Sequence, residues 1–210
     1  MGNAPPYRIE TERLVVRCWE PRDAPLLNEA IDESVDHLRP WMDWAHREPQ
    51  TLDEKIELLR TFRGSFDLGT DFIYGIFARD ESAVVGRSGL HHRAEEGSLE
   101  IGYWLRVSET GKGYMAEAVS ALTQAAFAWC DVERVDIRVA PANEASLKVA
   151  RRLGYVEEAV LRRRGEPLTE GAPRGDVVVF SLLAEELAGS PAAAVTFEAY
   201  DAAGRLIARA

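Results

Sequence analysis

The stretch Glu100–Ala118, EIGYWLRVSETGKGYMAEA, is the most informative segment for predicting the fold of this chain. Its first part is apolar and aromatic, as in a strand, whereas from Gly113 onward apolar residues recur at helical spacing. A tight turn directly before a helix points several backbone N–H groups at one spot, where the positive end of the helix dipole adds to them. Glycine lets a ligand approach the backbone closely. The segment therefore predicts a site for an anion such as a pyrophosphate.

Two better-known phosphate motifs are excluded at this turn. It is not a P-loop, because Lys112 is followed by Gly113 rather than by Ser or Thr, and the required earlier glycine is missing. It is not a dinucleotide-binding turn of the Rossmann type, because no βαβ unit with a downstream acidic residue surrounds it. Two glycines before a helix also occur in ordinary turns, so the segment alone leaves that alternative open.

The residues before this stretch predict a strand, two helices and an antiparallel meander. Thr51 and Glu54 form a capping box at the start of the second helix. The loop between the two helices carries Trp41 and Trp44. The expected elements are a strand at 13–19, helices from Pro21 to about Asp32 and from Leu52 to about Phe66, and strands at 72–78, 83–91 and 99–107, with turns at 79–82 and 95–98.

The residues after it predict further helices and strands and then a tail. A helix to about Trp129 is followed by a strand at 134–140, a helix at 143–153 that stops at Gly154, and strands at 155–161 and 177–183. This order predicts an α/β (α+β) domain at 1–188 with a mixed, mostly antiparallel sheet of six to seven strands. The tail at 189–210 has the pattern of a small β-hairpin, which leaves open whether it extends an edge, covers one or pairs with another subunit.

Composition limits the class of protein. The chain has 210 residues, of which 46% are hydrophobic and 29% charged, as expected for one globular domain. The net charge of −10 argues against nucleic-acid binding and is compatible with a cationic substrate. No apolar run is long enough to span a bilayer, and residues 1–7 do not resemble a signal peptide, so we expect a cytoplasmic protein without a membrane partner. Cys18 and Cys130 lack metal-type spacing, so we expect reduced thiols and no metal.

The glycine turn resembles motif A of the GNAT acetyltransferase superfamily, Gln/Arg-x-x-Gly-x-Gly/Ala at the start of the helix after the fourth strand. Gly113 matches the central glycine, whereas Thr110 stands in the Gln/Arg place and Met115 in the Gly/Ala place. The methionine is similar to what the RimJ/RimL branch has. The departure at Thr110 affects a side-chain contact only, since the family holds pyrophosphate mainly through backbone amides.

Other segments resemble the same branch, in the same order. The run 11–17 (TERLVVR) is similar to its opening T-x-R-L-x-L-R, 38–45 to its tryptophan loop, and 143–155 (NEASLKVARRLGY) to its Asn-x-x-Ser helix with a Leu-Gly-Phe/Tyr end. The resemblance covers roughly residues 8–185. It implies a GNAT-like sheet splayed between its fourth and fifth strands, with helices on both faces, and acetyl-CoA as cosubstrate.

The resemblance also implies which residues bind the cofactor. The backbone of Leu105 and Val107 would bind the pantetheine arm in the splay and polarise the thioester carbonyl. Lys112 and Arg151 are candidates for the phosphates. The full expected set is Leu105, Arg106, Val107, Thr110, Gly111, Lys112, Gly113, Tyr114, Met115, Asn143, Ser146 and Arg151.

Amine acetylation needs a base and a group that meets the departing thiolate. By the resemblance Glu100 is the first candidate for the base; His91 and His92 are alternatives, of which at most one can face the cleft because strand neighbours alternate. Ser146 is the candidate for the thiolate. Ala150 stands where many superfamily members carry a tyrosine that acts as the general acid.

The last part of the hypothesis concerns the groove that would bind the amine acceptor. Trp41, Trp44 and His91 are the candidates for lining the acceptor groove. The chain is thus expected to be an N-acetyltransferase of the RimJ/RimL type acting on a protein or peptide α-amine by direct attack in a ternary complex. Alternatives are a small amine as acceptor, such as a polyamine or an antibiotic, and a non-catalytic acyl-CoA-binding module. A homodimer is expected by analogy only.

Overall fold

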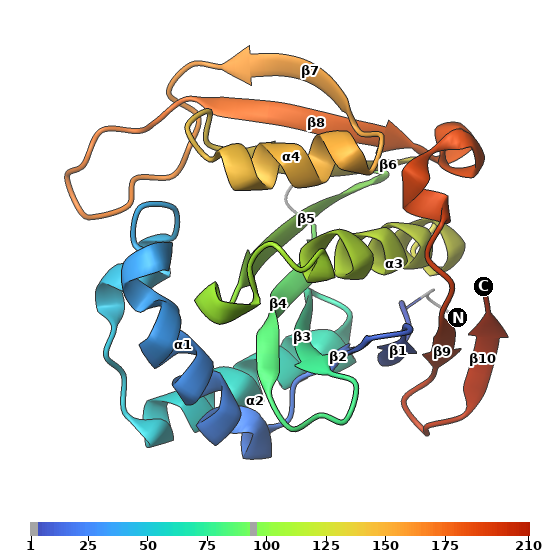
Figure 1. The fold of residues 1–210 in the computed structure, drawn as a ribbon, viewed down its shortest axis with the longest axis horizontal. Helices are drawn as coiled ribbons and strands as arrows, with labels where there is room; N and C mark the ends of the chain where they lie inside the picture. The colour runs from blue at the N-terminus through green and yellow to red at the C-terminus, as the bar shows by residue number, and fades with distance from the viewer. Residues whose placement is uncertain (1–3, 93–95) are drawn as a thin grey trace.

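The computed structural model describes residues 4–92 and 96–210, which form one mixed sheet with helices on both faces (Figure 1). Within these residues the strand order is β10-β9-β1-β2-β3-β4-β5-β6-β8-β7. Neighbours are antiparallel except for the parallel pair β5–β6. The strands are β1 (Arg8–Glu10), β2 (Leu14–Cys18), β3 (Phe72–Ala78), β4 (Val84–His91), β5 (Ser98–Leu105), β6 (Arg134–Val139), β7 (Val156–Leu161), β8 (Val177–Leu183), β9 (Glu198–Tyr200) and β10 (Leu206–Arg209).

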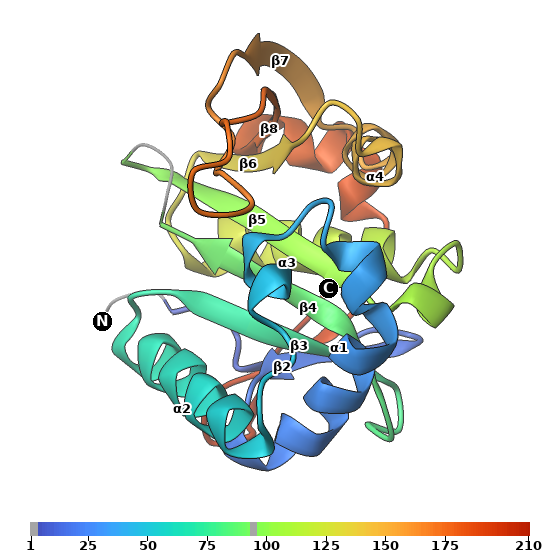
Figure 2. The same cartoon turned by 90° about the vertical axis from the view of Figure 1, so that its left-hand side faces the viewer.

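Two pairs of helices cover the sheet and define its two faces. Helices α1 (Ala24–Leu38) and α2 (Leu52–Leu68) pack side by side on one face, called here the α1/α2 face (Figure 2). Helices α3 (Tyr114–Trp129) and α4 (Glu144–Arg152) pack on the other, the α3/α4 face. Each face buries its own apolar core, which is why β2 and β3 carry apolar residues on both sides. The predicted capping box of α2 is confirmed, since Thr51 and Glu54 bond each other's backbone amides.

Over the residues that the structure describes, the sheet has ten strands rather than the six to seven expected. The additions are β1 and the tail strands β9 and β10, each of three or four residues. Strand β1 is too short to show a recognisable alternation, whereas the hairpin expected in the tail joins the sheet because β1 pairs with both β2 and β9. Helix α1 also continues to Leu38, beyond the expected end at Asp32, because Ser34 and Leu38 are buried on its inner side. The turn expected at 95–98 lies partly outside the described residues, which omit Glu95.

The sheet opens between β5 and β6. Their parallel ladder covers Ser98–Glu100 against Arg134–Asp136 and ends there, while β5 continues to Leu105. Beyond Asp136, β6 remains paired with β8 on its other side. Helix α3 packs mainly on β4 and β5, and α4 on β6 and β7, so the two helices lie on the two sides of the opening and contact each other there. This opening is the feature that positions the site.

The side chains of β5 alternate between the two faces on either side of the opening. Ile101, Tyr103 and Leu105 lie in the core of the α3/α4 face. Trp104 lies in the core of the α1/α2 face, and by the period of two Glu100 and Gly102 point to the same side as Trp104. The opening therefore has one set of side chains above it and another below it.

Among the residues that the structure describes, no helix is both long and apolar enough to cross a bilayer.

Candidate active site

The glycine turn between β5 and α3 forms a bend with exposed backbone amides. Gly111 and Gly113 have φ of 77° and 84°, a left-handed conformation that favours glycine. Gly113 is the N-cap of α3 and carries no side chain, so the first amides of the helix are available to a ligand. Of the atoms described, none lies within 4 Å of a Cβ built on Gly111. The bend thus has the room and the donors that a pyrophosphate requires.

The side chains of the bend turn away from this space. The hydroxyl of Thr110 donates to the carbonyl of Val107 at 2.8 Å, and Lys112 pairs with Glu109 at 2.9 Å. Met115 is buried in the core below the bend. A ligand at this bend would therefore meet backbone amides rather than the hydroxyl of Thr110.

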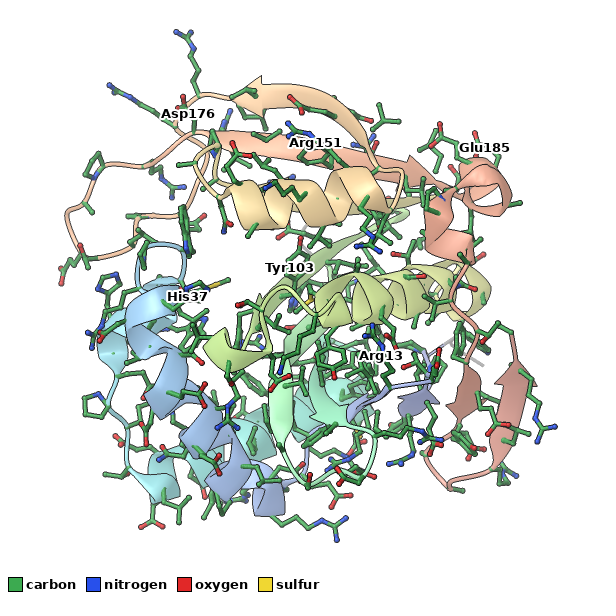
Figure 3. The ribbon with its side chains drawn as sticks, viewed as in Figure 1. Arg13, His37, Tyr103, Arg151, Asp176 and Glu185 are labelled. Atoms are coloured by element: carbon green, nitrogen blue, oxygen red, sulfur yellow. The ribbon has the colours of Figure 1, made fainter. Side chains whose placement is uncertain are left out.

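Arg13, which the sequence analysis did not assign to the site, fastens the bend to strand β2. Its Nη1 donates to the carbonyl of Lys112 at 3.0 Å, and its Nε donates to Glu117 at 2.6 Å. The guanidinium also lies 4.7 Å from the ring centre of Tyr114. Glu117 is buried in the first turn of α3 and accepts a further bond from the hydroxyl of Thr11. Arg13 thus holds the bend and neutralises a carboxylate beside the expected anion (Figure 3).

A cavity of about 740 Å³ adjoins the bend on its outer side. Besides the bend itself, its walls come from the end of α4 and from the tail, with Arg152, Pro191 and Val195 among them. Arg151, which the sequence analysis favoured, instead pairs with Glu157 on β7 at 2.9 Å. The helix therefore offers Arg152 rather than Arg151 to this cavity.

Of the residues expected to bind the pantetheine arm through their backbone, only Leu105 points its amide toward the opening. The amide of Arg106 donates to Val85 on β4, so by alternation the amide of Leu105 points to the opposite side, toward β6. Val107 is not brought there: its amide donates to the hydroxyl of Ser34 at 3.0 Å, because the strand ends at Leu105 and a 3₁₀ turn (Val107–Glu109) leads toward α1. The guanidinium of Arg106 likewise pairs with Glu29 and Glu33 of α1.

Three acid–base groups gather on the α1/α2 face where the opening begins. Glu100 and His91 are cross-strand partners on β5 and β4 and share this face. The Nδ1 atom of His91 lies 2.6 Å from a carboxylate oxygen of Asp71, and the imidazole is 4% exposed. A Cβ on Gly89 would lie 2.7 Å from Nε2 of His91, so the ring occupies room that only glycine leaves. His92, the other candidate, packs its ring near that of Phe72.

Charged groups lie beside Glu100, and aromatic groups lie elsewhere on the same face. Nε of Arg138 lies 3.4 Å from its carboxylate. Burial raises the pKa of the neighbouring Asp136, while its bond to Arg134 opposes this rise. Trp44 packs its ring 5.8 Å from that of Trp104, whereas Trp41 is half-buried and its amide donates to Leu38 at the end of α1. The structure thus brings Glu100 and His91 together, with Trp44 and Trp104 on the same side of the sheet.

On the α3/α4 face, the start of α4 meets β5. Asn143 is the N-cap of α4 and accepts a bond from the amide of Ser146 at 3.1 Å. The hydroxyl of Ser146 lies 2.9 Å from the phenol oxygen of Tyr103. Ala150, one turn later, is fully buried. The sequence analysis did not single out Tyr103, although strand alternation already placed its side chain on the face of β5 opposite to that of Glu100.

The comparisons with known proteins decide the family. Residues 13–156 match the model described as an acetyltransferase (GNAT) domain. The chain belongs to the GNAT acetyltransferase family. The match runs from Arg13 to the start of β7 and so includes the bend, the opening and both faces around it. GNAT membership makes the chain an acetyl-CoA-dependent N-acetyltransferase, and the resemblance to the RimJ/RimL branch is confirmed by its relatives.

Those relatives cover most of the chain. It is 29% identical over 162 residues to the [ribosomal protein uS5]-alanine N-acetyltransferase of Escherichia coli K12, covering 75% of this chain and 82% of that protein. It is 32% identical over 190 residues to the uncharacterized N-acetyltransferase p20 of Bacillus licheniformis, covering 86% and 98%. The fold matches RimL, a ribosomal L7/L12 α-N-protein acetyltransferase solved with coenzyme A, with a TM-score of 0.73 at 21% identity over 82% of this chain and 95% of that one.

Proposed function

We propose that this GNAT enzyme acetylates the N-terminal α-amine of a protein or peptide, with Glu100 as the base. The observation that carries the proposal is the position of Glu100. It lies where the β5–β6 ladder ends, on the α1/α2 face and beside His91. An acceptor amine on this face would reach a thioester in the opening without crossing the sheet.

The chemistry of the amine favours an α-amine as acceptor. With a pKa of about 7.8, an α-amine costs roughly 1.1 kcal/mol to deprotonate at pH 7, against roughly 4.6 kcal/mol for a lysine amine of pKa about 10.4. A carboxylate acting directly or through a water molecule is a sufficient base for the first of these. The net charge of −10 also favours a basic protein chain over a neutral one.

The chain's own groups supply the rest of the site. Bound acetyl-CoA supplies the activated thioester. The amides of Gly111, Gly113 and Tyr114 would hold its pyrophosphate, and the backbone of Leu105 would bind its pantetheine arm within the opening. The cavity of about 740 Å³ beside the bend has the position expected for the nucleotide end.

The reaction balances with these groups. The amine nitrogen attacks the thioester carbon, a C–N bond forms and the C–S bond breaks. The proton lost by the amine passes to Glu100, and the sulfur keeps the electron pair of the broken bond. Backbone amides of β5 that face the opening would stabilise the charge on the carbonyl oxygen.

The relatives support a protein N-terminus as the acceptor. The E. coli relative is named for alanine acetylation of ribosomal protein uS5, and RimL for α-N-acetylation of ribosomal L7/L12. We extend this acceptor class to the present chain as part of the proposal.

The test compares acceptors that differ only in which amine is free. One peptide has a free N-terminus and no lysine, and a second has an acetylated N-terminus and one internal lysine; spermidine represents small amines. Purified protein is incubated with acetyl-CoA, the release of free thiol is followed, and the products are identified by mass spectrometry. We expect turnover with the first peptide. Turnover confined to the lysine peptide or to spermidine would contradict the proposal.

A further inference from the structure

Tyr103 connects the two elements that border the opening on the α3/α4 face. It lies on β5, and its phenol oxygen lies 2.9 Å from the hydroxyl of Ser146 in the first turn of α4. Figure 3 shows Tyr103 in the space between α4 and α3. Strand β5 borders the opening on one side, and α4 packs on β6, which borders it on the other side. This hydrogen bond therefore crosses the opening just beyond the point where the β5–β6 ladder ends.

The phenol is enclosed and remains protonated. Burial raises the pKa of Tyr103 to about 12, and the bond to Ser146 only partly opposes this rise. Either hydroxyl can be the donor in the pair. When Ser146 donates to the phenol oxygen, the phenol O–H donates to the backbone carbonyl of Ser146 at 3.3 Å, a long bond that a sulfur in the opening would replace. Such chained hydrogen bonds strengthen one another.

Tyr103 and Glu100 point to opposite faces of the same strand. The separation of three positions along β5 reverses the side-chain direction, and Tyr103 lies in the core of the α3/α4 face. An amine that meets Glu100 thus enters from one face, and the group it displaces leaves toward the other. The group that leaves is the sulfur of coenzyme A.

We propose that Tyr103, supported by Ser146, is a catalytic residue that donates a hydrogen bond to the departing sulfur. This inference rests on the proposed function, because it requires the thioester to lie in the opening. The C–S bond breaks and the sulfur takes the electron pair, while the phenol proton stays on its oxygen and the amine proton goes to Glu100. Ala150, one helical turn after Ser146, leaves the helix without a phenol at that position, and the strand supplies one instead.

The test removes one hydroxyl and compares two ligands. Binding of coenzyme A and of desulfo-coenzyme A, which lacks the sulfur, is measured by calorimetry at one fixed pH for the wild-type protein and for Tyr103→Phe. A hydrogen bond to the sulfur makes coenzyme A bind about tenfold more tightly than the desulfo analogue. We expect this ratio to fall to about one in Tyr103→Phe, and kcat to fall about 10- to 100-fold with an unchanged KM for acetyl-CoA.

Tyr155→Phe is the matched control. Its phenol is also buried and lies 2.7 Å from the hydroxyl of Thr123, so the variant loses the same kind of bond, but one made to α3 rather than between β5 and the start of α4. We expect Tyr155→Phe to keep both the ligand ratio and kcat. If Tyr103→Phe behaves as Tyr155→Phe does, the inference is overturned while the proposed function stands. If the wild-type protein binds neither ligand, the proposed function fails and this inference fails with it.

Discussion

Arg13 connects strand β2 with the glycine bend and the first turn of α3 through a single guanidinium. It donates to the carbonyl of Lys112, pairs with Glu117 and lies over the ring of Tyr114. Because Lys112 lies within the bend, the position of the bend's amides depends on this side chain. Glu117, left without its cation, would place an unpaired buried carboxylate beside the phosphates.

We therefore expect Arg13→Gln to weaken the binding of acetyl-CoA. The KM should rise about tenfold, as for the loss of one charge-assisted hydrogen bond, with little change in kcat. Steady-state rates and calorimetry with coenzyme A provide the measurement. Arg205→Gln, which removes an exposed ion pair with Asp201 in the tail, is the control. Equal KM values in the two variants would remove Arg13 from the site.

At Glu100, the expected loss is in turnover rather than in affinity. We expect Glu100→Gln to lower kcat about 100-fold, because the amide cannot accept the amine proton. Affinity for coenzyme A should stay within about twofold, since the bend is untouched. The same two measurements on His91→Gln are the comparison. If His91→Gln loses turnover and Glu100→Gln does not, the base is the His91–Asp71 pair.

At the scale of elements, the bend depends on a backbone conformation that glycine provides. We expect Gly113→Glu to abolish coenzyme A binding, because the new side chain carries a negative charge into the anion site. The control is Gly171→Glu in a surface loop, where φ is also positive at 77°, so the backbone strain is similar. Binding is measured by calorimetry and folding by circular dichroism. Unchanged affinity in Gly113→Glu would argue against the placement of the pyrophosphate.

The segment that follows the tryptophan loop is attached to α2 by a buried ion pair. Lys55 of α2 is fully buried and pairs with Glu48, which also accepts a bond from the amide of Gln50. We expect Lys55→Met to lower the free energy of unfolding by about 3 kcal/mol, because it leaves the Glu48 carboxylate buried without a cation. Urea denaturation provides the measurement. The double variant Lys55→Met/Glu48→Leu should recover most of the loss, and a failure to recover would show that packing, not charge, is responsible.

At the scale of the molecule, the tail is part of the sheet and lines the cavity beside the bend. Ser120 and Gln124 of α3 donate to the carbonyl of Ala192, at 2.5 Å and 3.0 Å, and the buried Phe197 and Ala199 belong to the core of the α3/α4 face. Strand β9 covers the edge of β1. The tail thus extends the sheet edge, which the sequence had left as one of three outcomes.

We expect removal of residues 190–210 to lower the melting temperature by at least about 5 °C, because it uncovers buried apolar side chains and the β1 edge. It should also raise the KM for acetyl-CoA, since Pro191 and Val195 line the cavity beside the bend. Thermal unfolding and steady-state rates provide the measurements. A shortened chain with an unchanged melting temperature and KM would show that the tail is dispensable for both.

Much of this arrangement followed from local patterns. The capping box at Thr51, the helical spacing after Gly113 and the strand-turn-helix around the bend act over a few residues and are found as expected. The short strand β1 pairs with β9 near the other end of the chain, and α1 continues past Asp32 to where Ser34 accepts a bond from Val107. No pattern of a few residues contains that information.

The sequence by itself determined the family-typical elements, their order and the glycine bend, because propensity, capping and periodicity are properties of neighbouring residues. Only the tertiary structure decided which side chains meet: Arg13 with the bend, His91 with Asp71, and Tyr103 with Ser146. It also decided that Val107 does not face the opening, because its amide donates to the hydroxyl of Ser34. Such contacts join residues tens of positions apart, so they are fixed by the way the sheet opens and the helices pack, and by no local signal.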